Sequence, residues 1–191
     1  MTNFRITLEQ DGENFETLAD ILPEKSDQLD ILFIAKTPAT KSVAVGHYFQ
    51  GQQGQMFWSR LREYQILKTK PSTYEDENLL DNKFGLTDIV KKPKDFGDEP
   101  SESEYRDGLQ RILKLIKKYR PKVIVFVYKR VLDNVLKWGH GLNKKSVYGF
   151  NRDLNSYFDS EVFVFPMPGT PCTKDQAVKA MNELSKKMRD R

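Results

Sequence analysis

The 191-residue sequence has few of the side chains that build disulfides or metal centres. Cys172 is its single cysteine, which excludes an internal disulfide and a cysteine-rich zinc site. His47 and His140 are its two histidines, too few for a histidine metal cluster. We therefore expect a protein that works without a metal.

Other signals are also missing. No apolar run approaches the roughly 20 residues of a membrane span. The N-terminal residues, MTNFRITLEQDGENF, lack the basic-then-apolar pattern of a signal peptide. Neither Gly-rich phosphate-binding loop, G-x-G-x-x-G or G-x-x-x-x-G-K-[ST], occurs. These absences predict a cytoplasmic protein with no membrane partner and no cofactor.

The composition is that of one soluble globular domain, with 30% charged and 38% hydrophobic residues. The net charge of +4 and the pI of about 9.0 permit binding to nucleic acid. They do not establish it, because an excess of lysine is common on solvated surfaces.

Hydrophobic patterning predicts strands that alternate with helices, which indicates a parallel α/β sheet. The predicted strands are Leu29–Ala35, Phe84–Val90, Val123–Tyr128 and Glu161–Phe165, with an edge segment at Val147–Phe150. The predicted helices are Gln55–Leu67, one that begins at a Ser101/Glu104 capping box, Arg130–Trp138, and one that begins at a Thr173/Gln176 capping box. Residues 1–28 form a polar extension with a weak amphipathic helix at Phe15–Leu22.

The stretch Ile31–Trp58 organises the chain. Its strand runs into a loop of small residues at the carboxyl edge of the sheet, where open α/β folds bind ligands. The strand ends in Ala35-Lys36-Thr37-Pro38-Ala39. Gly46 and Phe49 follow nine and twelve residues after Thr37, and Gln55-Met56-Phe57-Trp58 comes next.

This pattern resembles the first motif of the uracil-DNA glycosylase superfamily, in its mismatch-specific or thymine-DNA glycosylase branch. There the strand runs into Gly-Ile-Asn-Pro-Gly, and the closing Asn-x-Phe-Trp comes one residue earlier. The segments FGLTDIVKKP, FVYKR and PMPGTP are similar to later landmarks of the branch, in the same order.

The resemblance implies a three-layer α/β/α fold with a four-stranded parallel sheet, built from residues 29–191 as a single domain. It implies a monomer that binds double-stranded DNA across the carboxyl ends of the strands. It also implies a monofunctional DNA glycosylase, which hydrolyses the N-glycosidic bond of a flipped nucleotide.

The main departure is Thr37, which replaces the Asn that positions the attacking water. A threonine hydroxyl can hold a water but is a poor general base near neutral pH. Three interpretations remain open. The leaving base needs little help, or Gln55 or Asp88 has taken over the catalytic role, or the protein is a silent DNA-binding module of the same fold.

Asp88 replaces an Asn or Lys of the second-strand motif. A carboxylate can only accept hydrogen bonds, which suits the exocyclic amine of cytosine. The small residues Ala39, Ser42, Ala44 and Gly46 leave room for a substituent. This favours a modified or mispaired cytosine-type base, with defence against phage that carry modified DNA as one setting. The alternative function is the repair of uracil, thymine mismatches or hypoxanthine. The alternative role for Asp88 is a structural one, a solvent-facing salt bridge with Lys91 or Lys92.

The remaining expected roles come from the same resemblance. Phe49 stacks on the base, in a pocket with Pro38, Ala39, Ser42 and Gly46. Gly169, Thr170 and Pro171 enter the minor groove, with Pro171 as the wedge and Met167 as the alternative. The phosphate-binding candidates are Lys41, Lys129, Thr173 and Lys174. Lys36 is expected to face away from Thr37, which argues against lyase chemistry through a Schiff base.

Overall fold

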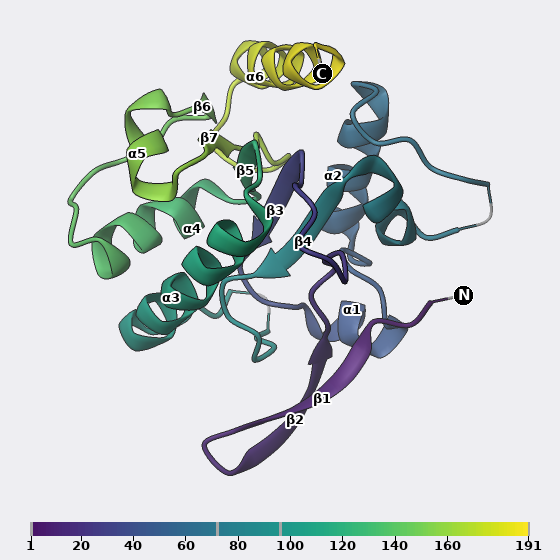
Figure 1. The fold of residues 1–191 in the computed structure, drawn as a ribbon, viewed down its shortest axis with the longest axis vertical. Coiled ribbons are helices and arrows are strands. Elements are labelled where there is room, and N and C mark those ends of the chain that lie inside the picture. The colour runs from purple at the N-terminus through teal and green to yellow at the C-terminus, as the bar shows by residue number, and fades with distance from the viewer. Residues whose placement is uncertain (1, 72, 96, 191) are drawn as a thin grey trace.

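The structure, a computed structural model, describes residues 2–71, 73–95 and 97–190. A five-stranded sheet with the order β4-β3-β5-β7-β6 lies at its centre (Figure 1). The strands are β3 (Ile31–Ala35), β4 (Phe84–Asp88), β5 (Val123–Phe126), β6 (Gly149–Phe150) and β7 (Glu161–Val164). Four strands are parallel, and β6 adds an antiparallel pair with β7 at one edge. The parallel sheet of four strands is therefore confirmed, and the short fifth strand β6 falls within the edge segment predicted at Val147–Phe150.

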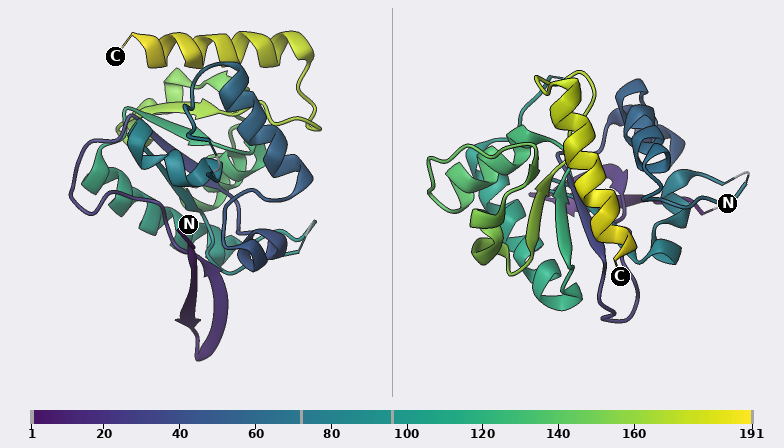
Figure 2. Two further views of the ribbon diagram at one scale, coloured as in Figure 1. Left: turned by 90° about the vertical axis from the view of Figure 1, so that its right-hand side faces the viewer. Right: turned by 90° about the horizontal axis from the view of Figure 1, so that it is seen from above.

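Helices cover both faces of this sheet, as Figure 2 shows. In β3, Phe33 points into a core shared with the helices α2 (Gln52–Glu63) and α6 (Lys174–Arg189). Leu32 and Ile34 point into a second core, shared with α3 (Glu102–Tyr119) and α4 (Lys129–Asn134). This alternation is the period-2 geometry of a strand, and it explains why β3 is buried along its whole length. The three-layer α/β/α architecture is confirmed.

The helix starts follow from local capping. Ser101 Oγ accepts a hydrogen bond from Glu104 N at 3.2 Å, and Glu104 Oε2 accepts one from Ser101 N at 2.7 Å. Thr173 and Gln176 form the same reciprocal pair before the last helix. Both predicted capping boxes are confirmed. The longer helices are α2 (Gln52–Glu63), α3 (Glu102–Tyr119) and α6 (Lys174–Arg189).

The shorter helical elements lie mostly in the connections. They are α1 (Thr40–Val45), α4 (Lys129–Asn134), α5 (Asn155–Phe158), the 3₁₀ turns η1 (Glu75–Asn78), η2 (Leu80–Asn82) and η4 (Arg152–Leu154), and the π-helical turn η3 (Val135–Gly139). The helix α1 lies inside the segment that the sequence analysis treats as loop. Among the described residues, no helix combines the length and the apolar character that a membrane crossing requires.

The N-terminal segment forms a hairpin rather than the helix predicted at Phe15–Leu22, so that prediction was wrong. Its strands, β1 (Arg5–Gln10) and β2 (Glu13–Leu18), pair antiparallel and project from the body (Figure 1). Asp11 and Gly12 at the tip have φ values of 54° and 78°. An Asp-Gly turn with two positive φ angles matches the twist of a two-residue hairpin, which explains the preference for strands.

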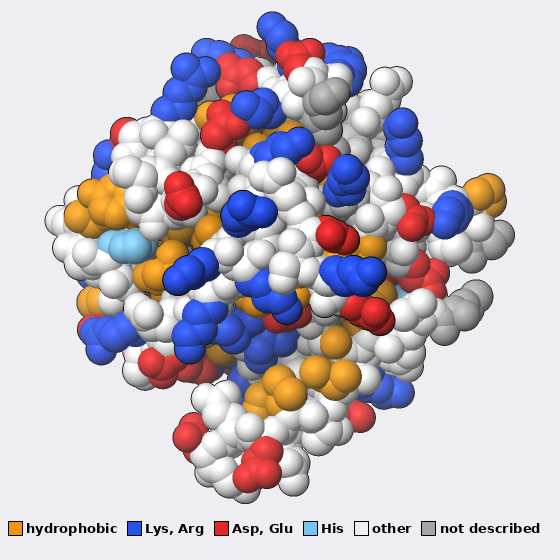
Figure 3. All heavy atoms as spheres, in the orientation of Figure 1, with side chains coloured by type: hydrophobic (Ala, Val, Ile, Leu, Met, Phe, Trp, Pro, Cys, Tyr) orange, Lys and Arg blue, Asp and Glu red, His pale blue; other side chains and the backbone are white. Residues whose placement is uncertain are grey.

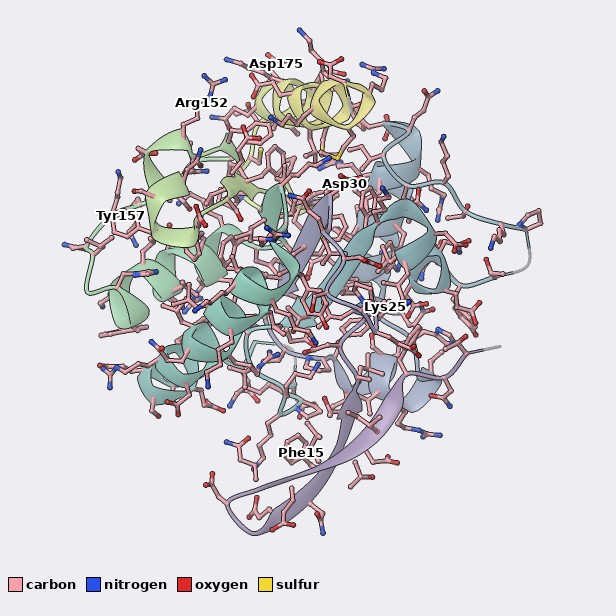
Figure 4. The ribbon with its side chains drawn as sticks, in the orientation of Figure 1. Phe15, Lys25, Asp30, Arg152, Tyr157 and Asp175 are labelled. Atoms are coloured by element: carbon pink, nitrogen blue, oxygen red, sulfur yellow. The ribbon has the colours of Figure 1, made fainter. Side chains whose placement is uncertain are left out.

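The base of this hairpin is docked on the domain, whereas its tip is acidic. Ile21 exchanges two backbone hydrogen bonds of 2.9 Å with Leu86 on the edge strand β4. Phe15, labelled in Figure 4, lies on β2, with Lys92 Nζ 5.9 Å from its ring centroid. Figure 3 shows acidic side chains at the outer end of the hairpin and lysine and arginine where it joins the body. The hairpin thus extends the surface beside the carboxyl ends of the strands.

Candidate functional site

A cavity of about 800 Å³ opens at the carboxyl ends of β3, β4 and β5. Parallel strands end at the same edge of a sheet, so their loops enclose the cavity together. Eight of the residues predicted for the site line it, and these are Thr37, Pro38, Ala39, Lys41, Ser42, Phe49, Asp88 and Gly169. The structure thus brings together the core of the predicted site.

Several other predicted residues do not line the cavity, and two of the predictions for them were wrong. Met167 is only 1% exposed and packs in the core, so it cannot act as a wedge. Gln55 is exposed on α2 and donates a hydrogen bond to Phe49 O at 3.3 Å, so it does not face the cavity as a catalytic residue would. Gln53, two residues earlier, lines the cavity instead.

The remaining predicted residues lie around the site. Gly46 caps α1 with a φ of 84°, so a turn rather than a base contact requires its glycine. Lys129 pairs with Asp133 at 2.9 Å. Thr170 donates its hydroxyl to Met167 O at 2.6 Å. Pro171 is exposed, and Thr173 and Lys174 stand at the start of α6. Their predicted DNA contacts remain predictions.

Phe49 lies on the cavity wall in a conformation that non-glycine residues rarely adopt. Its φ is 58°, and its ring packs 4.6 Å from Phe57 and 5.5 Å from Trp58, measured between centroids. Gly54 explains how this conformation is accommodated. A Cβ on Gly54 would lie 2.4 Å from Phe49 O, so only glycine lets α2 approach this closely.

Thr37 is half-buried on the cavity wall. Among the described residues, its hydroxyl has no hydrogen-bond partner, so it is free to hold a water. The neighbouring Lys36 also lines the cavity, but its Nζ donates to Asp98 O at 2.7 Å and lies 3.8 Å from Glu99 Oε2. The loop after β4 therefore already engages the lysine amine.

Asp88 lies at the floor of the cavity, where β4 ends, and is 1% exposed. Its Oδ2 accepts hydrogen bonds from Tyr48 OH at 2.9 Å and from Lys91 Nζ at 3.2 Å. Its Oδ1 is buried and has no partner among the described residues. Burial raises the pKa of the Asp88 carboxyl, and the Lys91 ammonium works in the opposite direction. The salt bridge considered for Asp88 thus forms with Lys91, but it is buried rather than solvent-facing.

A second layer of charge comes from the N-terminal segment. Asp20 accepts hydrogen bonds from Thr87 Oγ1 at 2.7 Å, from Lys91 Nζ at 2.9 Å and from Arg111 Nη1 at 2.8 Å. Arg111 also donates to the backbone oxygen of Asp88. No chemistry was predicted for residues 1–28, because no local sequence signal around Asp20 marks this role.

The backbone before Phe49 is fixed by a buried pair that the sequence analysis also missed. His47 Nδ1 and Asp76 Oδ1 are 2.9 Å apart, and Asp76 Oδ2 accepts a hydrogen bond from Tyr48 N at 2.7 Å. Burial raises the pKa of the Asp76 carboxyl, against the hydrogen bonds from Tyr48 and His47. The His47 ring stacks on Tyr74 at 3.7 Å. These contacts hold the turn that presents Tyr48 and Phe49 to the cavity.

A further chain of contacts ties the loop after β7 to the cavity. Tyr128 OH donates to Gln53 Oε1 at 3.4 Å, and Gln53 Nε2 donates to Pro168 O at 3.3 Å. Burial raises the pKa of Tyr128 to about 12, so its hydroxyl stays protonated. The predicted groove-entering loop is thereby joined to α2 and β5.

The fold and the cavity define an open α/β domain that takes its ligand at the carboxyl ends of a parallel sheet. The chain belongs to the uracil DNA glycosylase superfamily, whose family model matches residues 22–180. It is similar to a G/U mismatch-specific uracil DNA glycosylase from Schizosaccharomyces pombe, with 27% identity over 136 residues. That similarity covers 70% of this chain and 42% of the relative, so the chain spans less than half of the relative's length.

Proposed function

We propose that the protein is a monofunctional DNA glycosylase that excises a flipped pyrimidine carrying an exocyclic amine, most simply a 5-modified cytosine. Membership of the superfamily and the position of the cavity support hydrolysis of an N-glycosidic bond. One observation carries the choice of base, namely the buried Asp88 Oδ1, which has no hydrogen-bond partner within residues 2–71, 73–95 and 97–190. A buried acceptor without a donor is costly, and a donor on the base relieves that cost.

The residues around the cavity suit this reaction. The flipped base stacks on Phe49, which contributes on the order of 1–3 kcal/mol. The Thr37 hydroxyl orients a water toward C1′ of the sugar. As the C1′–N bond breaks, its electron pair leaves with the base, the water oxygen bonds to C1′, and a proton of the water passes to the base. Because Thr37 is a poor general base, the scheme favours a base that leaves readily.

The size of the cavity supports a substituted base. A volume of about 800 Å³ exceeds what a pyrimidine ring fills. Ala39 and Ser42 line it, whereas Ala44 and Gly46 do not. Because Asp88 Oδ1 is itself buried, an amine of the base reaches it only when the cavity lining moves slightly. A 5-modified cytosine substrate would place the protein in defence against phage with modified DNA.

Uracil in a G·U mismatch is the second candidate, and the similarity to the G/U mismatch-specific uracil DNA glycosylase of Schizosaccharomyces pombe favours it. Uracil presents O4, an acceptor, where cytosine presents an amine. Asp88 would have to be protonated to donate to O4. The burial that raises the pKa of Asp88 favours that state. The two candidate substrates therefore require different charge states of the Asp88 side chain.

A panel of duplexes tests the proposal. Each duplex carries uracil, a thymine mispair, hypoxanthine, cytosine or a 5-substituted cytosine, and alkali cleaves the strand wherever a base has been released. We expect cleavage at the 5-substituted cytosine, loss of it in Asp88→Ala and Thr37→Ala, and a shift of preference toward uracil in Asp88→Asn. Asp81→Asn, at an exposed aspartate paired with Lys70, is the matched control.

Base release from none of these duplexes, together with salt-dependent duplex binding, would instead establish a silent DNA-binding module. Release of uracil alone would assign the protein to the second candidate. An unchanged preference in Asp88→Asn would remove Asp88 as the residue that selects the base.

A further inference from the structure

The two carboxylate oxygens of Asp88 differ in their hydrogen bonds. Oδ2 accepts from Tyr48 and Lys91, whereas Oδ1 has no partner among the described residues. We propose that Tyr48 and Lys91 are specificity-determining positioning residues, which occupy Oδ2 of Asp88 and hold the carboxylate as an acceptor whose Oδ1 is left for an exocyclic amine. This inference rests on the proposed function and names the residues that set its choice of base. Tyr48 lies within the stretch Ile31–Trp58 and Lys91 within the segment FGLTDIVKKP, but neither residue is assigned a role in selecting the base by the superfamily resemblance.

Tyr48 has the geometry of a fixed donor. Its side chain is buried, its backbone N is held by Asp76, and its backbone O accepts from Trp58 Nε1 at 3.2 Å. Its hydroxyl lies 2.9 Å from Asp88 Oδ2 and 3.1 Å from Ala19 O. The single proton serves the closer and charged acceptor better. Burial raises the pKa of Tyr48 well above its usual range, so the phenol stays a donor at working pH.

The Lys91 ammonium uses all three of its donors in the same hydrogen-bond network. Its side chain is 13% exposed, and Nζ lies 2.9 Å from Asp20 Oδ1, 3.1 Å from Tyr48 OH and 3.2 Å from Asp88 Oδ2. An ammonium has three donors, and these three partners use them. Lys91 is therefore a fixed positive charge beside Asp88 rather than a free amine at the cavity.

The charge of Asp88 depends on few neighbours. The charged and titratable groups that face it are Lys91 after β4, Tyr48 before α2, Asp20 after β2 and Arg111 on α3. Asp20 opposes ionisation of Asp88, but it is itself bound to both Lys91 and Arg111. Lys91 is thus the cation that contacts the Asp88 carboxylate directly among the described residues.

The charge of Asp88 therefore decides whether the site prefers a base with an exocyclic amine or one with a carbonyl oxygen, such as uracil O4. An ionised Asp88 accepts from an amine and repels the O4 of uracil, whereas a protonated Asp88 can donate to O4. Removing the Lys91 charge disfavours the ionised form, and removing the Tyr48 hydroxyl leaves Oδ2 with one donor fewer. Both changes should move preference away from an amine-bearing base.

The experiment compares kcat/KM for 5-substituted cytosine and uracil duplexes over a range of pH, in the intact chain of 191 residues. Lys91→Met and Tyr48→Phe remove the two donors at nearly constant size, and Lys91→Arg restores the charge. Lys92→Met is the control, because Lys92 pairs with Glu13 on the surface and not with Asp88. Circular dichroism and thermal unfolding check that each variant is folded.

We expect the cytosine-to-uracil ratio of kcat/KM to fall about tenfold or more in Lys91→Met and Tyr48→Phe, the effect of losing a hydrogen bond to a charged group. In Lys91→Met, the rise of activity on 5-substituted cytosine should move to higher pH. Lys91→Arg should recover most of the ratio, and Lys92→Met should match the wild type.

The outcomes separate this inference from the proposed function. An active wild type, with folded Lys91→Met and Tyr48→Phe variants that keep its ratio and pH profile, overturns the inference and leaves the proposed function standing. A wild type that releases no base, or uracil alone, overturns the proposed function and the inference with it. Should Lys91→Met fail to fold, Tyr48→Phe decides the question by its ratio.

Discussion

Gly54→Ala tests how the cavity wall is built. The added Cβ would lie 2.4, 2.5 and 2.6 Å from the O, C and Cα atoms of Phe49. All three contacts are to backbone, so no side-chain rotation can relieve them. Since Phe49 already has a φ of 58°, the substitution must push Phe49 and its turn away from α2. The change therefore acts on the residue expected to stack on the base.

Two opposing terms set the magnitude. Replacing a helical glycine by alanine gains at most about 1 kcal/mol in helix propensity. Overpacking a tight contact costs about 1–3 kcal/mol, and a clash with backbone belongs at the upper end. We therefore expect Gly54→Ala to lower the free energy of unfolding by about 1–2 kcal/mol. For a chain of this length, that corresponds to a Tm lower by about 2–8 °C.

Urea unfolding and thermal unfolding measure the loss. Trp58 fluorescence reports the local shift, because Trp58 Nε1 donates to Tyr48 O and its ring lies 5.5 Å from that of Phe49. Gly51→Ala is the control, since its Cβ would meet no atom of the described part of the chain within 4 Å and only the helix N-cap preference is lost. A Gly54→Ala protein that unfolds like the wild type, with unchanged Trp58 fluorescence, would refute the reasoning.

Two further predictions concern the loop after β7 and the floor of the cavity. Met167→Ala should lower the free energy of unfolding by about 2–5 kcal/mol because it opens a core cavity, whereas Pro171→Ala should stay within about 0.5 kcal/mol of wild type and reduce base release if Pro171 is the wedge. Equal destabilisation by the two, in urea unfolding, would contradict their assignment. Asp88 has a folded pKa above the ordinary 3.8, so its contribution to stability is present at acid pH and is lost as pH rises through the folded pKa. The free energy of unfolding of Asp88→Asn, taken relative to that of the wild type, should therefore be higher at pH 7 than at pH 4. Urea unfolding midpoints that show the reverse would contradict this prediction.

Local patterns in the sequence determine much of this protein. The continuous apolar runs of β3 and β5 can only be buried on both faces of a parallel sheet, which gives the three layers. The two capping boxes fix where α3 and α6 begin, because their donors and acceptors are three residues apart. The resemblance of the Thr37–Phe49 segment to the first motif of the superfamily predicts that both residues belong to one site, and both line the cavity. These features depend on neighbouring residues, so they can be predicted from the chain alone.

Only the tertiary structure decided the chemistry around Asp88. Tyr48 lies 40 residues from Asp88 along the chain, and Asp20 lies 67 residues from its partner Thr87. No periodicity or motif encodes which of many tyrosines and aspartates meet across such distances. The packing of the hairpin base against β4 brings Asp20 into the network, and the approach of α2 turns Gln53 rather than Gln55 to the cavity. The sequence therefore predicts where the site lies, whereas long-range packing decides which charged side chains surround it.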